Sequence, residues 1–332
     1  RAFITHTADV DRMSGAVPTF DPRGTRYDQS TFLGRLAHFR EMTDPRTLLT
    51  TPEELRRCRS LLESHAQGKA KGASDQELWE AKRVTDAIVH PVTGDEMFLP
   101  GRMSAFVPVN TIPTAGMLLA KTTGQTIFWQ WLNQSVNVMV NYVNRSGAAV
   151  DTAQVAQAYG LAVGVSCGIA VGARKLIQSG GPGIKRLGIA VPYMAVVSAG
   201  AANVGFTRLP EMQHGVPIAA RDGTQLGVSK AAAQSAVINT VLSRNLLLPI
   251  APMLFPPLAM AAISAAVSLG PLAAAAAETC LVAGSIYGAL PMAIAVFPQE
   301  MVIPVASLEP EFQNRKNKKG ELITEVLCNK GL

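Results

Sequence analysis

Amide side chains recur every four residues in one stretch of this 332-residue chain, and such groups can bind a small polar solute. Asn133, Asn137 and Asn141 fall on one face of a helix, because four residues make about one helical turn. The alternative is a helix at the membrane interface whose amides form hydrogen bonds within the protein. Trp129 and Trp131 are typical of such an interface, and the two interpretations are equally favoured. The candidate binding residues are Asn133, Gln134, Ser135 and Asn137.

Groups that could catalyse a reaction or bind a metal are sparse. The five histidines are far apart and form neither an HxxxH nor an HExxH motif, and the four cysteines form no CxxC pair. The glycine-rich segment 180–183 lacks the lysine and the Ser/Thr of a phosphate-binding loop. The sequence therefore predicts a protein that is not an enzyme and has no cofactor and no metal ion. A metal site assembled from distant segments is the less favoured alternative.

The composition is typical of a membrane protein rather than a soluble enzyme. Charged residues make up 16% of the chain, against about 25% in soluble proteins, and the mean hydropathy is +0.19. The net charge of +6 arises between residues 121 and 299, where basic residues are too scattered for a nucleic-acid groove. We expect positive membrane loops and no nucleic-acid partner.

Uncharged stretches long enough to span a bilayer occur only after residue 102, because a membrane helix needs about 20 residues. Three are Met103 to Ala120, Thr152 to Ala173 and Leu187 to Thr207, and the region 231–299 holds two more. A soluble protein would need a very large core to bury all five. The predicted fold class is all-α, a polytopic membrane protein with about five transmembrane helices. Four or six are the alternatives, since prolines blur the last helix ends.

A soluble helical arm is predicted before the membrane helices. Two helices begin there at capping sequences, Thr51-Pro52-Glu53-Glu54 and Ser74-Asp75-Gln76-Glu77. They end near His90-Pro91, since proline disfavours helix at the residue before it. The predicted domains are the arm at 1–102, a transmembrane helical domain at 103–299 and a C-terminal tail at 300–332.

Loop charge predicts the orientation of the chain in the membrane. Four basic and no acidic residues lie between the second and third predicted spans, which places this connector on the positive side. With five spans, the arm shares the compartment of the connector and the tail lies opposite. The basic residues are Arg174, Lys175, Lys185 and Arg186.

Two further features of the predicted spans suggest contacts within the membrane. Glycines every four residues line one face of the second span, and this face favours packing between two helices of one chain over a homodimer interface. Arg244 and Glu278 are the charges expected at membrane depth, either as an ion pair, which is slightly favoured, or lining a translocation path. The glycines are Gly160, Gly164, Gly168 and Gly172.

Several short sequences along the chain resemble one known family, the sideroflexins, from about Asp28 to Leu332. The most recognisable is Trp129-Gln130-Trp131 followed by Asn133-Gln134-Ser135, and His90-Pro91 with Thr93-Gly94 is similar to a family motif that has aspartate where this chain has Val92. Other matching words are Asp28-Gln29-Ser30-Thr31-Phe32, Thr43-Asp44-Pro45-Arg46, Ser307-Leu308-Glu309 and Asn329-Lys330-Gly331-Leu332.

The resemblance implies a multi-pass carrier of the mitochondrial inner membrane that moves small neutral amino acids, chiefly serine, into the matrix for one-carbon metabolism. It agrees with an arm on the matrix side and with the amide stretch as the binding site. His90, Pro91, Thr93 and Gly94 would act as a gate or a brace. Two departures bear on the mechanism: Val92 removes a carboxylate, and Ala261 to Ala277 is apolar where the family has a charged connector.

The rival prediction is a scaffold or accessory subunit bound to a larger inner-membrane protein complex, without transport. The basic connector, the apolar last loop and the glycine face could all serve as docking surfaces. A transporter should keep a polar cavity that a scaffold could fill. Iron or porphyrin handling is disfavoured, since the sequence offers no cluster of ligands.

Overall fold

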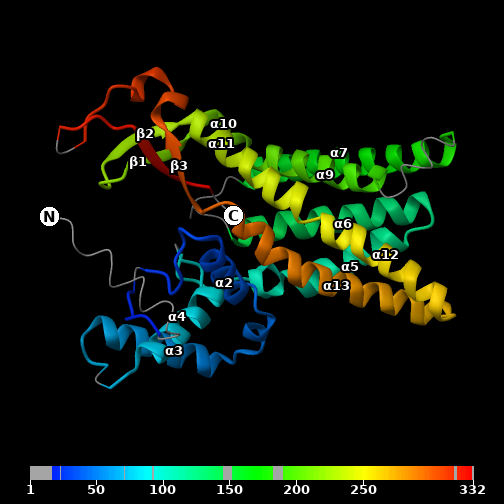
Figure 1. Cartoon of the computed structure of the whole chain (residues 1–332), viewed down its shortest axis with the longest axis horizontal. Helices are drawn as coiled ribbons and strands as arrows, with labels where there is room; N and C mark the ends of the chain where they lie inside the picture. Colours follow the sequence, from blue (N-terminus) through cyan, green and yellow to red (C-terminus); the bar gives the residue numbers. More distant parts are fainter. Residues whose placement is uncertain are drawn as a thin grey trace.

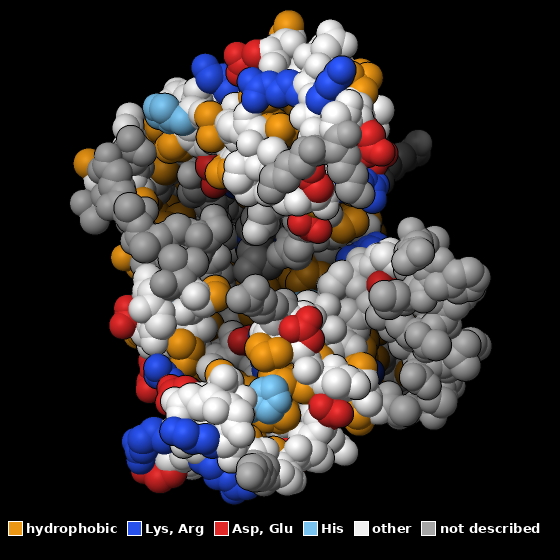
Figure 2. All heavy atoms as spheres, turned by 90° about the vertical axis from the view of Figure 1, so that its left-hand side faces the viewer, with side chains coloured by type: hydrophobic (Ala, Val, Ile, Leu, Met, Phe, Trp, Pro, Cys, Tyr) orange, Lys and Arg blue, Asp and Glu red, His pale blue; other side chains and the backbone are white. Residues whose placement is uncertain are grey.

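The computed structural model consists of a helical arm, a bundle of long helices and a small β-sheet. It describes residues 17–22, 24–70, 72–91, 93–144, 152–181, 190–317 and 320–330. Figure 1 shows the arm and the sheet at one end of the molecule, with the bundle extending away from both. Seen from that end, the surface is hollowed between the sheet above and the arm below (Figure 2).

The arm is built from three helices and a short 3-10 turn, α2 (Phe32–Met42), η1 (Pro45–Leu49), α3 (Pro52–Ala66) and α4 (Asp75–Ile88). The two predicted helix starts are confirmed. The Thr51 hydroxyl accepts from the Glu54 backbone N–H, and Ser74 and Glu77 form a complete capping box. The arm is joined to the bundle through α2, where Arg35 Nε donates to the Ala295 carbonyl at 2.8 Å.

Long helices run side by side in the bundle. They are α5 (Phe106–Leu119), α6 (Thr123–Val143), α7 (Thr152–Ser179), α9 (Ala190–Thr207), α11 (Lys230–Thr240), η4 (Val241–Leu247), α12 (Ile250–Ala266) and α13 (Pro271–Ala295). The segment η4 has π-helical hydrogen bonding and joins α11 to α12 without a break. Helix α6 packs against both α5 and α7, while α13 packs against α12, α5 and the arm helix α2.

Three helices in the described part of the chain are long and apolar enough to cross a membrane. They are Val155–Ser179, Lys230–Ala266 and Pro271–Ala295, and the shorter apolar helices are Met103–Leu119 and Val196–Thr207. These five cover the predicted spans, although only three meet the criteria of length and composition.

Helix α6 changes the path that the sequence predicted for the chain. It returns along the bundle between α5 and α7, so the C-terminal end of α7 lies at the end remote from the arm (Figure 1). There Arg174 donates to the Ala120 carbonyl, whereas Asn144 at the other end of α6 donates to the Gly101 carbonyl at 2.8 Å. The expectation that the arm shares the end of Arg174 and Lys175 is therefore wrong. Lys185 and Arg186 lie outside the described residues.

The all-α prediction is wrong in one region, because four strands form an antiparallel sheet of order β2-β1-β4-β3. The sheet joins a hairpin that follows α10 (Leu209–His214) to the C-terminal tail, with Ala219 paired to Leu327. Its strands are β1 (Val216–Ala220), β2 (Gln225–Ser229), β3 (Glu300–Pro304) and β4 (Glu325–Asn329). Five-residue strands paired across a hundred residues give little local signal, so helical patterning could not reveal them.

The tail lies at the same end as the arm and not opposite it. Lys330 Nζ donates to the Phe297 carbonyl at 3.3 Å, two residues beyond the Ala295 carbonyl that holds Arg35. The tail is also tied to the bundle at the start of α11, where the Glu309 carboxylate accepts from the Ser229 hydroxyl and from two backbone N–H groups. This end of the bundle is therefore closed by segments from both termini.

Among the described residues, the glycine face of α7 does not pack against another helix. A Cβ atom built on any of its four glycines meets no atom within 4 Å among the described residues. Helix α7 contacts α6 and α9 through other side chains, such as buried Ala162 and Ser166. Within the described part of the chain, the prediction of intrachain packing is therefore wrong for Gly160, Gly164, Gly168 and Gly172, whose face is open there.

Candidate functional site

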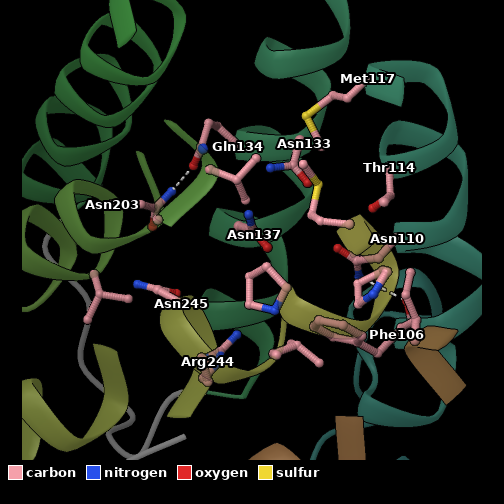
Figure 3. A pocket seen from close by; sticks show the side chains of 18 of the residues that line it. Phe106, Asn110, Thr114, Met117, Asn133, Gln134, Asn137, Asn203, Arg244 and Asn245 are labelled. Atoms are coloured by element: carbon pink, nitrogen blue, oxygen red, sulfur yellow. Dashed lines mark hydrogen bonds between the residues drawn. The ribbon is translucent and has the colours of Figure 1, made fainter. Parts of the chain in front are cut away.

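A cavity of about 110 Å³ lies inside the bundle, between α5, α6, α9, η4, α12 and α13. Its apolar walls include Phe106, Met117 and Met253, and the rest of its lining is rich in amides (Figure 3). The polar residues that line it are Asn110, Thr114, Asn133, Gln134, Asn137, Asn141, Asn203, Arg244 and Asn245. We name this space the central cavity.

The amide face of α6 forms one wall of the central cavity. Asn133, Gln134, Asn137 and Asn141 all line it, so the structure brings together three of the four predicted binding residues. Ser135 is not among the lining residues. Its hydroxyl donates to the Trp131 carbonyl and lies 2.9 Å from the Tyr159 hydroxyl of α7. At 100° per residue, position 135 is about 200° from position 133 and faces the other side of the helix.

The Gln134 and Asn203 side chains meet at one side of the cavity. Asn203 Nδ2 donates to Gln134 Oε1, and both side chains are almost fully buried, with exposed fractions of 2% and 1% (Figure 3). Asn203 Oδ1 is buried and has no hydrogen-bond partner in the described part of the structure. An unmet buried acceptor is costly, so this oxygen is suited to a donor group on a ligand.

Arg244 supplies the positive charge of the central cavity. It lies in η4, and its guanidinium donates to Asn141 Oδ1 at 3.0 Å. The neighbouring Asn245 Nδ2 is buried and has no partner among the described residues. None of the described lining residues is Asp or Glu. This side of the cavity therefore offers a cation and a spare donor to an anionic group.

The predicted ion pair between Arg244 and Glu278 is wrong. No ion pair joins them among the described residues, and Arg244 instead lines the cavity. Their depths differ, because η4 lies near Asn141 at the arm end of α6, whereas Glu278 lies two turns from the start of α13 at the opposite end (Figure 1). The alternative, that these charges line a translocation path, stays a prediction, and of the two only Arg244 lines the central cavity.

The chemistry of the cavity suits a small zwitterion. A carboxylate can accept from Arg244 and Asn245, while an ammonium group can donate to Asn203 Oδ1. The cavity is smaller than the roughly 300 to 1,000 Å³ of pockets that hold drug-sized ligands, which restricts it to small solutes. Within the described residues, no cluster of three His, Cys, Asp or Glu side chains could hold a metal ion.

The His-Pro motif forms a turn in the arm and does not line the central cavity. His90 is buried; its carbonyl accepts from the Gly94 N–H at 2.9 Å, and its Nδ1 accepts from the Thr93 N–H at 3.2 Å. Gly94 has a φ of +74°, which favours glycine there. The turn follows α4 and precedes α5, and the role of these residues as a gate or a brace stays a prediction. Val92 lies outside the described residues.

Apart from Arg244, sequence reasoning missed the polar cavity residues that come from helices other than α6. Asn110 lies in α5, Asn203 in α9 and Asn245 in η4, and each is an amide within an apolar run. Such residues are costly in a membrane unless they are paired or face a cavity. A search for isolated amides within the predicted spans would have found all three.

Comparisons with known proteins give one consistent family. The Sideroflexins family profile matches residues 21–332. The chain is 40% identical over 328 residues to "Sideroflexin" of Dictyostelium discoideum, covering 96% of this chain and 99% of that protein. It is 39% identical over 326 residues to "Sideroflexin-1" of Mus musculus and 38% identical over 335 residues to "Sideroflexin FSF1" of Saccharomyces cerevisiae, each covering 96% of this chain and 100% of the relative. No solved structure matches the chain.

Proposed function

Because this chain belongs to the sideroflexin family over nearly its whole length, we propose that it carries small neutral amino acids, chiefly serine, across the mitochondrial inner membrane. Sideroflexins are generally transporters and not enzymes. In this proposal serine reaches the matrix and feeds one-carbon metabolism.

The central cavity is the observation that carries the proposal. It lies within the helical bundle, and its lining includes the Arg244 guanidinium and the unmet amide oxygen of Asn203. Serine presents a carboxylate, an ammonium group and a hydroxyl, and all three can be met by Arg244 and the amides without a buried acidic residue. Asn133, Gln134 and Asn137 are the proposed binding residues from α6, while Ser135 is dropped because it faces α7.

The membrane arrangement follows from the bundle. We propose that the three long and two shorter apolar helices cross the membrane together with α6, which makes six crossings and carries its amide face inward. The arm and the sheet then share one compartment, since both lie at the same end of the bundle (Figure 1). The matrix placement of that end rests on the family resemblance, because Arg174 and Lys175 lie at the other end.

Uptake of labelled serine into liposomes that contain the purified protein tests the proposal. We expect saturable uptake by the wild-type protein, a large reduction for Asn133→Ala and none with empty liposomes. Thermal unfolding of each variant confirms that it is folded. Absence of uptake by folded, inserted wild-type protein would contradict the carrier function, and unchanged uptake by Asn133→Ala would remove Asn133 from the site.

A second function, that of an accessory subunit of a larger inner-membrane protein complex, is favoured by the open glycine face of α7. This face lets another backbone approach closely, and no part of the described chain covers it. An accessory subunit should migrate with its complex at a fixed ratio on a native gel, and Gly164→Leu should release it. Migration of the protein alone, together with serine uptake, would leave only the carrier function.

A further inference from the structure

The central cavity is the middle member of a row of three cavities. Toward the end remote from the arm it adjoins a cavity of about 330 Å³, which we name the mouth, and the two share Met117, Val196 and Met253. The mouth is also lined by Gln130 and Arg174. Apolar side chains alone are therefore common to the central cavity and the mouth.

Toward the sheet, the central cavity adjoins a much smaller space, which we name the Lys330 chamber. Its volume is about 20 Å³, close to that of a single water site. Asn141 and Arg244 line both the central cavity and the chamber, and the hydrogen bond between them lies where the two spaces meet. A movement of the Arg244 side chain would thus join the two spaces.

The Lys330 chamber repeats the polar pattern of the central cavity. It has a cation, Lys330, whose side chain is buried and whose Nζ donates only to a backbone carbonyl among the contacts described. It also has a buried acceptor without a partner among the described residues, Gln299 Oε1. The central cavity has Arg244 and Asn203 Oδ1 in the same two roles. None of the described residues that line the chamber is acidic.

The charge around Lys330 favours an anion. Burial and the neighbouring cations Arg244, Arg208 and Arg35 lower the pKa of Lys330 to about 8. Glu211 is already engaged by Arg208 through its carboxylate. A carboxylate that enters the chamber would relieve the repulsion among these cations and give Lys330 a charged partner.

We infer that Lys330 and Gln299 form a second amino-acid-binding station, which receives the substrate carboxylate from Arg244 when the hydrogen bond between Asn141 and Arg244 opens. The inference rests on the proposed carrier function and extends it to a path. Gln299 also lines an open cavity of about 580 Å³ along β1, β3 and β4, on the end of the molecule that Figure 2 shows hollowed between sheet and arm. The path therefore runs from the mouth, through the central cavity and the Lys330 chamber, to the sheet.

The structure is then one state of a transport cycle. The mouth is wide and the Lys330 chamber is too small for an amino acid. Substrate would reach the central cavity from the end remote from the arm, and the chamber must expand for release toward the sheet. Transport requires the station at Lys330, whereas binding of serine in the central cavity does not. Loss of transport with retained binding therefore distinguishes the station at Lys330 from the central cavity.

The test compares Lys330→Met with Lys330→Arg, using Lys316→Met as the matched control on an exposed lysine of the same tail. Equilibrium binding of labelled serine to the purified full chain and serine uptake into liposomes are measured for each. We expect Lys330→Met to bind serine within about twofold of wild type but to transport it about tenfold more slowly, the usual cost of a lost charged hydrogen bond. Lys330→Arg should retain most of the uptake, and Lys316→Met all of it.

Equal uptake by Lys330→Met and wild type would overturn the second station while leaving the carrier function intact. Parallel loss of binding and uptake in folded Lys330→Met would also overturn it, because the chamber would then be part of the first site. If Lys330→Met does not fold, Gln299→Leu decides by the same two measurements. If wild type itself takes up no serine, the carrier function fails and not merely the station.

Discussion

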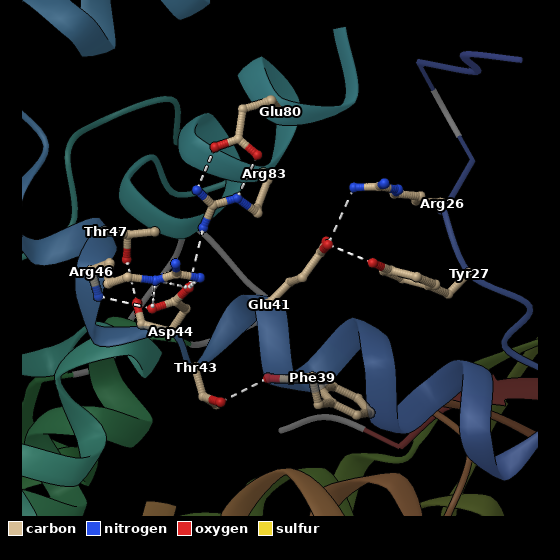
Figure 4. Close-up of polar contacts among 10 residues, drawn as sticks. All are labelled: Arg26, Tyr27, Phe39, Glu41, Thr43, Asp44, Arg46, Thr47, Glu80 and Arg83. Atoms are coloured by element: carbon tan, nitrogen blue, oxygen red, sulfur yellow. Dashed lines mark hydrogen bonds and ion pairs between the residues drawn. The ribbon is translucent and has the colours of Figure 1, made fainter. Parts of the chain in front are cut away.

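Polar side chains in the arm are paired around two carboxylates, whereas buried amides in the central cavity keep spare capacity. Among the described residues of the arm, one buried side-chain nitrogen, Arg83 Nη1, has no hydrogen bond, and it lies near the Asp44 carboxylate. In the arm, the Asp44 carboxylate receives the Arg46 guanidinium, with Arg83 at 3.8 Å, and Glu41 receives Tyr27 and Arg26 (Figure 4). In the cavity, by contrast, Asn203 Oδ1 and Asn245 Nδ2 have no partner among the described residues. Matched groups stabilise a fold, whereas unmatched ones keep hydrogen bonds available to a ligand.

Titration of the arm reflects this matching. Hydrogen bonds from Arg46 hold the pKa of Asp44 below its usual value, against the opposing effect of burial. Burial, followed by the hydrogen bond to Glu41, raises the pKa of Tyr27 to about 12. At neutral pH, Asp44 is therefore ionised and accepts hydrogen bonds from Arg46, while Tyr27 keeps the proton that it donates to Glu41. The polar residues of the arm are therefore expected to act on stability, and those of the cavity on transport.

Arg244→Gln should show the largest effect, a loss of serine uptake of about 10- to 100-fold, because charged hydrogen bonds contribute about 1.5–3 kcal/mol. Glutamine can still donate to Asn141, so the fold should persist. Liposome uptake and thermal unfolding measure the two effects. The control is Arg56→Gln, an exposed arginine of α3. Uptake within twofold of wild type in folded Arg244→Gln would put the charge outside the site.

Asn137→Ala should raise the KM for serine uptake roughly fivefold, the usual effect of one neutral hydrogen bond. Ser135→Ala is its matched control, because Ser135 is on the same helix but faces Tyr159 of α7. The KM of the control should stay at the wild-type value. Equal effects of the two substitutions would show that the inward face of α6 has no special role.

Asp44→Ala should destabilise the protein by about 1–3 kcal/mol, because it removes a helix cap and a carboxylate with two arginine partners. The KM for serine should not change, since Asp44 does not line the central cavity. Thermal unfolding at neutral pH measures the loss, with Glu63→Ala on the exposed face of α3 as control. A changed KM with unchanged stability would reverse the contrast between arm and cavity.

Acid should erase the stabilising contribution of Asp44. Its pKa is lowered in the folded protein, so the contribution is present above the unfolded-state value of 3.8 and is lost as the pH falls through the folded-state value. The difference in unfolding temperature between wild type and Asp44→Ala should therefore be constant near neutral pH and shrink below about pH 4. A difference that grows in acid would show that the carboxylate is not stabilising.

Gly168→Ala should have the smallest effect and should leave the protein unchanged or stabilise it by up to about 1 kcal/mol. Alanine favours helix more than glycine does, and no atom of the described chain lies near the new methyl group. Gly116→Ala is the opposite case, because its methyl group would collide with the Trp129 indole. Thermal unfolding distinguishes them. Strong destabilisation by Gly168→Ala would indicate that its face is covered.

Local patterns predicted the parts of the fold that depend on neighbouring residues. The caps at Thr51 and Ser74 set the starts of α3 and α4, and the period of the amides placed Asn133 and Asn137 on a common face. The sheet was missed because its register joins β1 to β4 across a hundred residues. The direction of α7 was missed because α6 is too polar to be counted as a crossing helix.

The candidate site was predictable along α6 and, in part, at Arg244, which the sequence had marked as a charge at membrane depth. Its partners Asn203 and Arg244 come from α9 and η4, and their approach depends on how the helices pack. For the same reason, charge alone could not decide between an Arg244 that pairs with Glu278 and one that lines a cavity. Unpaired amide atoms such as Asn203 Oδ1 and Asn245 Nδ2 are a property of the packed structure and leave no mark in a single sequence.

Protection of a cysteine by serine tests the central claim most directly. The chain has four free cysteines, and after their replacement by serine a single cysteine is introduced as Asn137→Cys or as Ser135→Cys. The rate of modification by a small thiol reagent is measured with and without serine. We predict that serine slows modification at position 137 and leaves position 135 unaffected. Equal rates with and without serine at position 137, in protein that transports serine, would contradict the central cavity as the binding site.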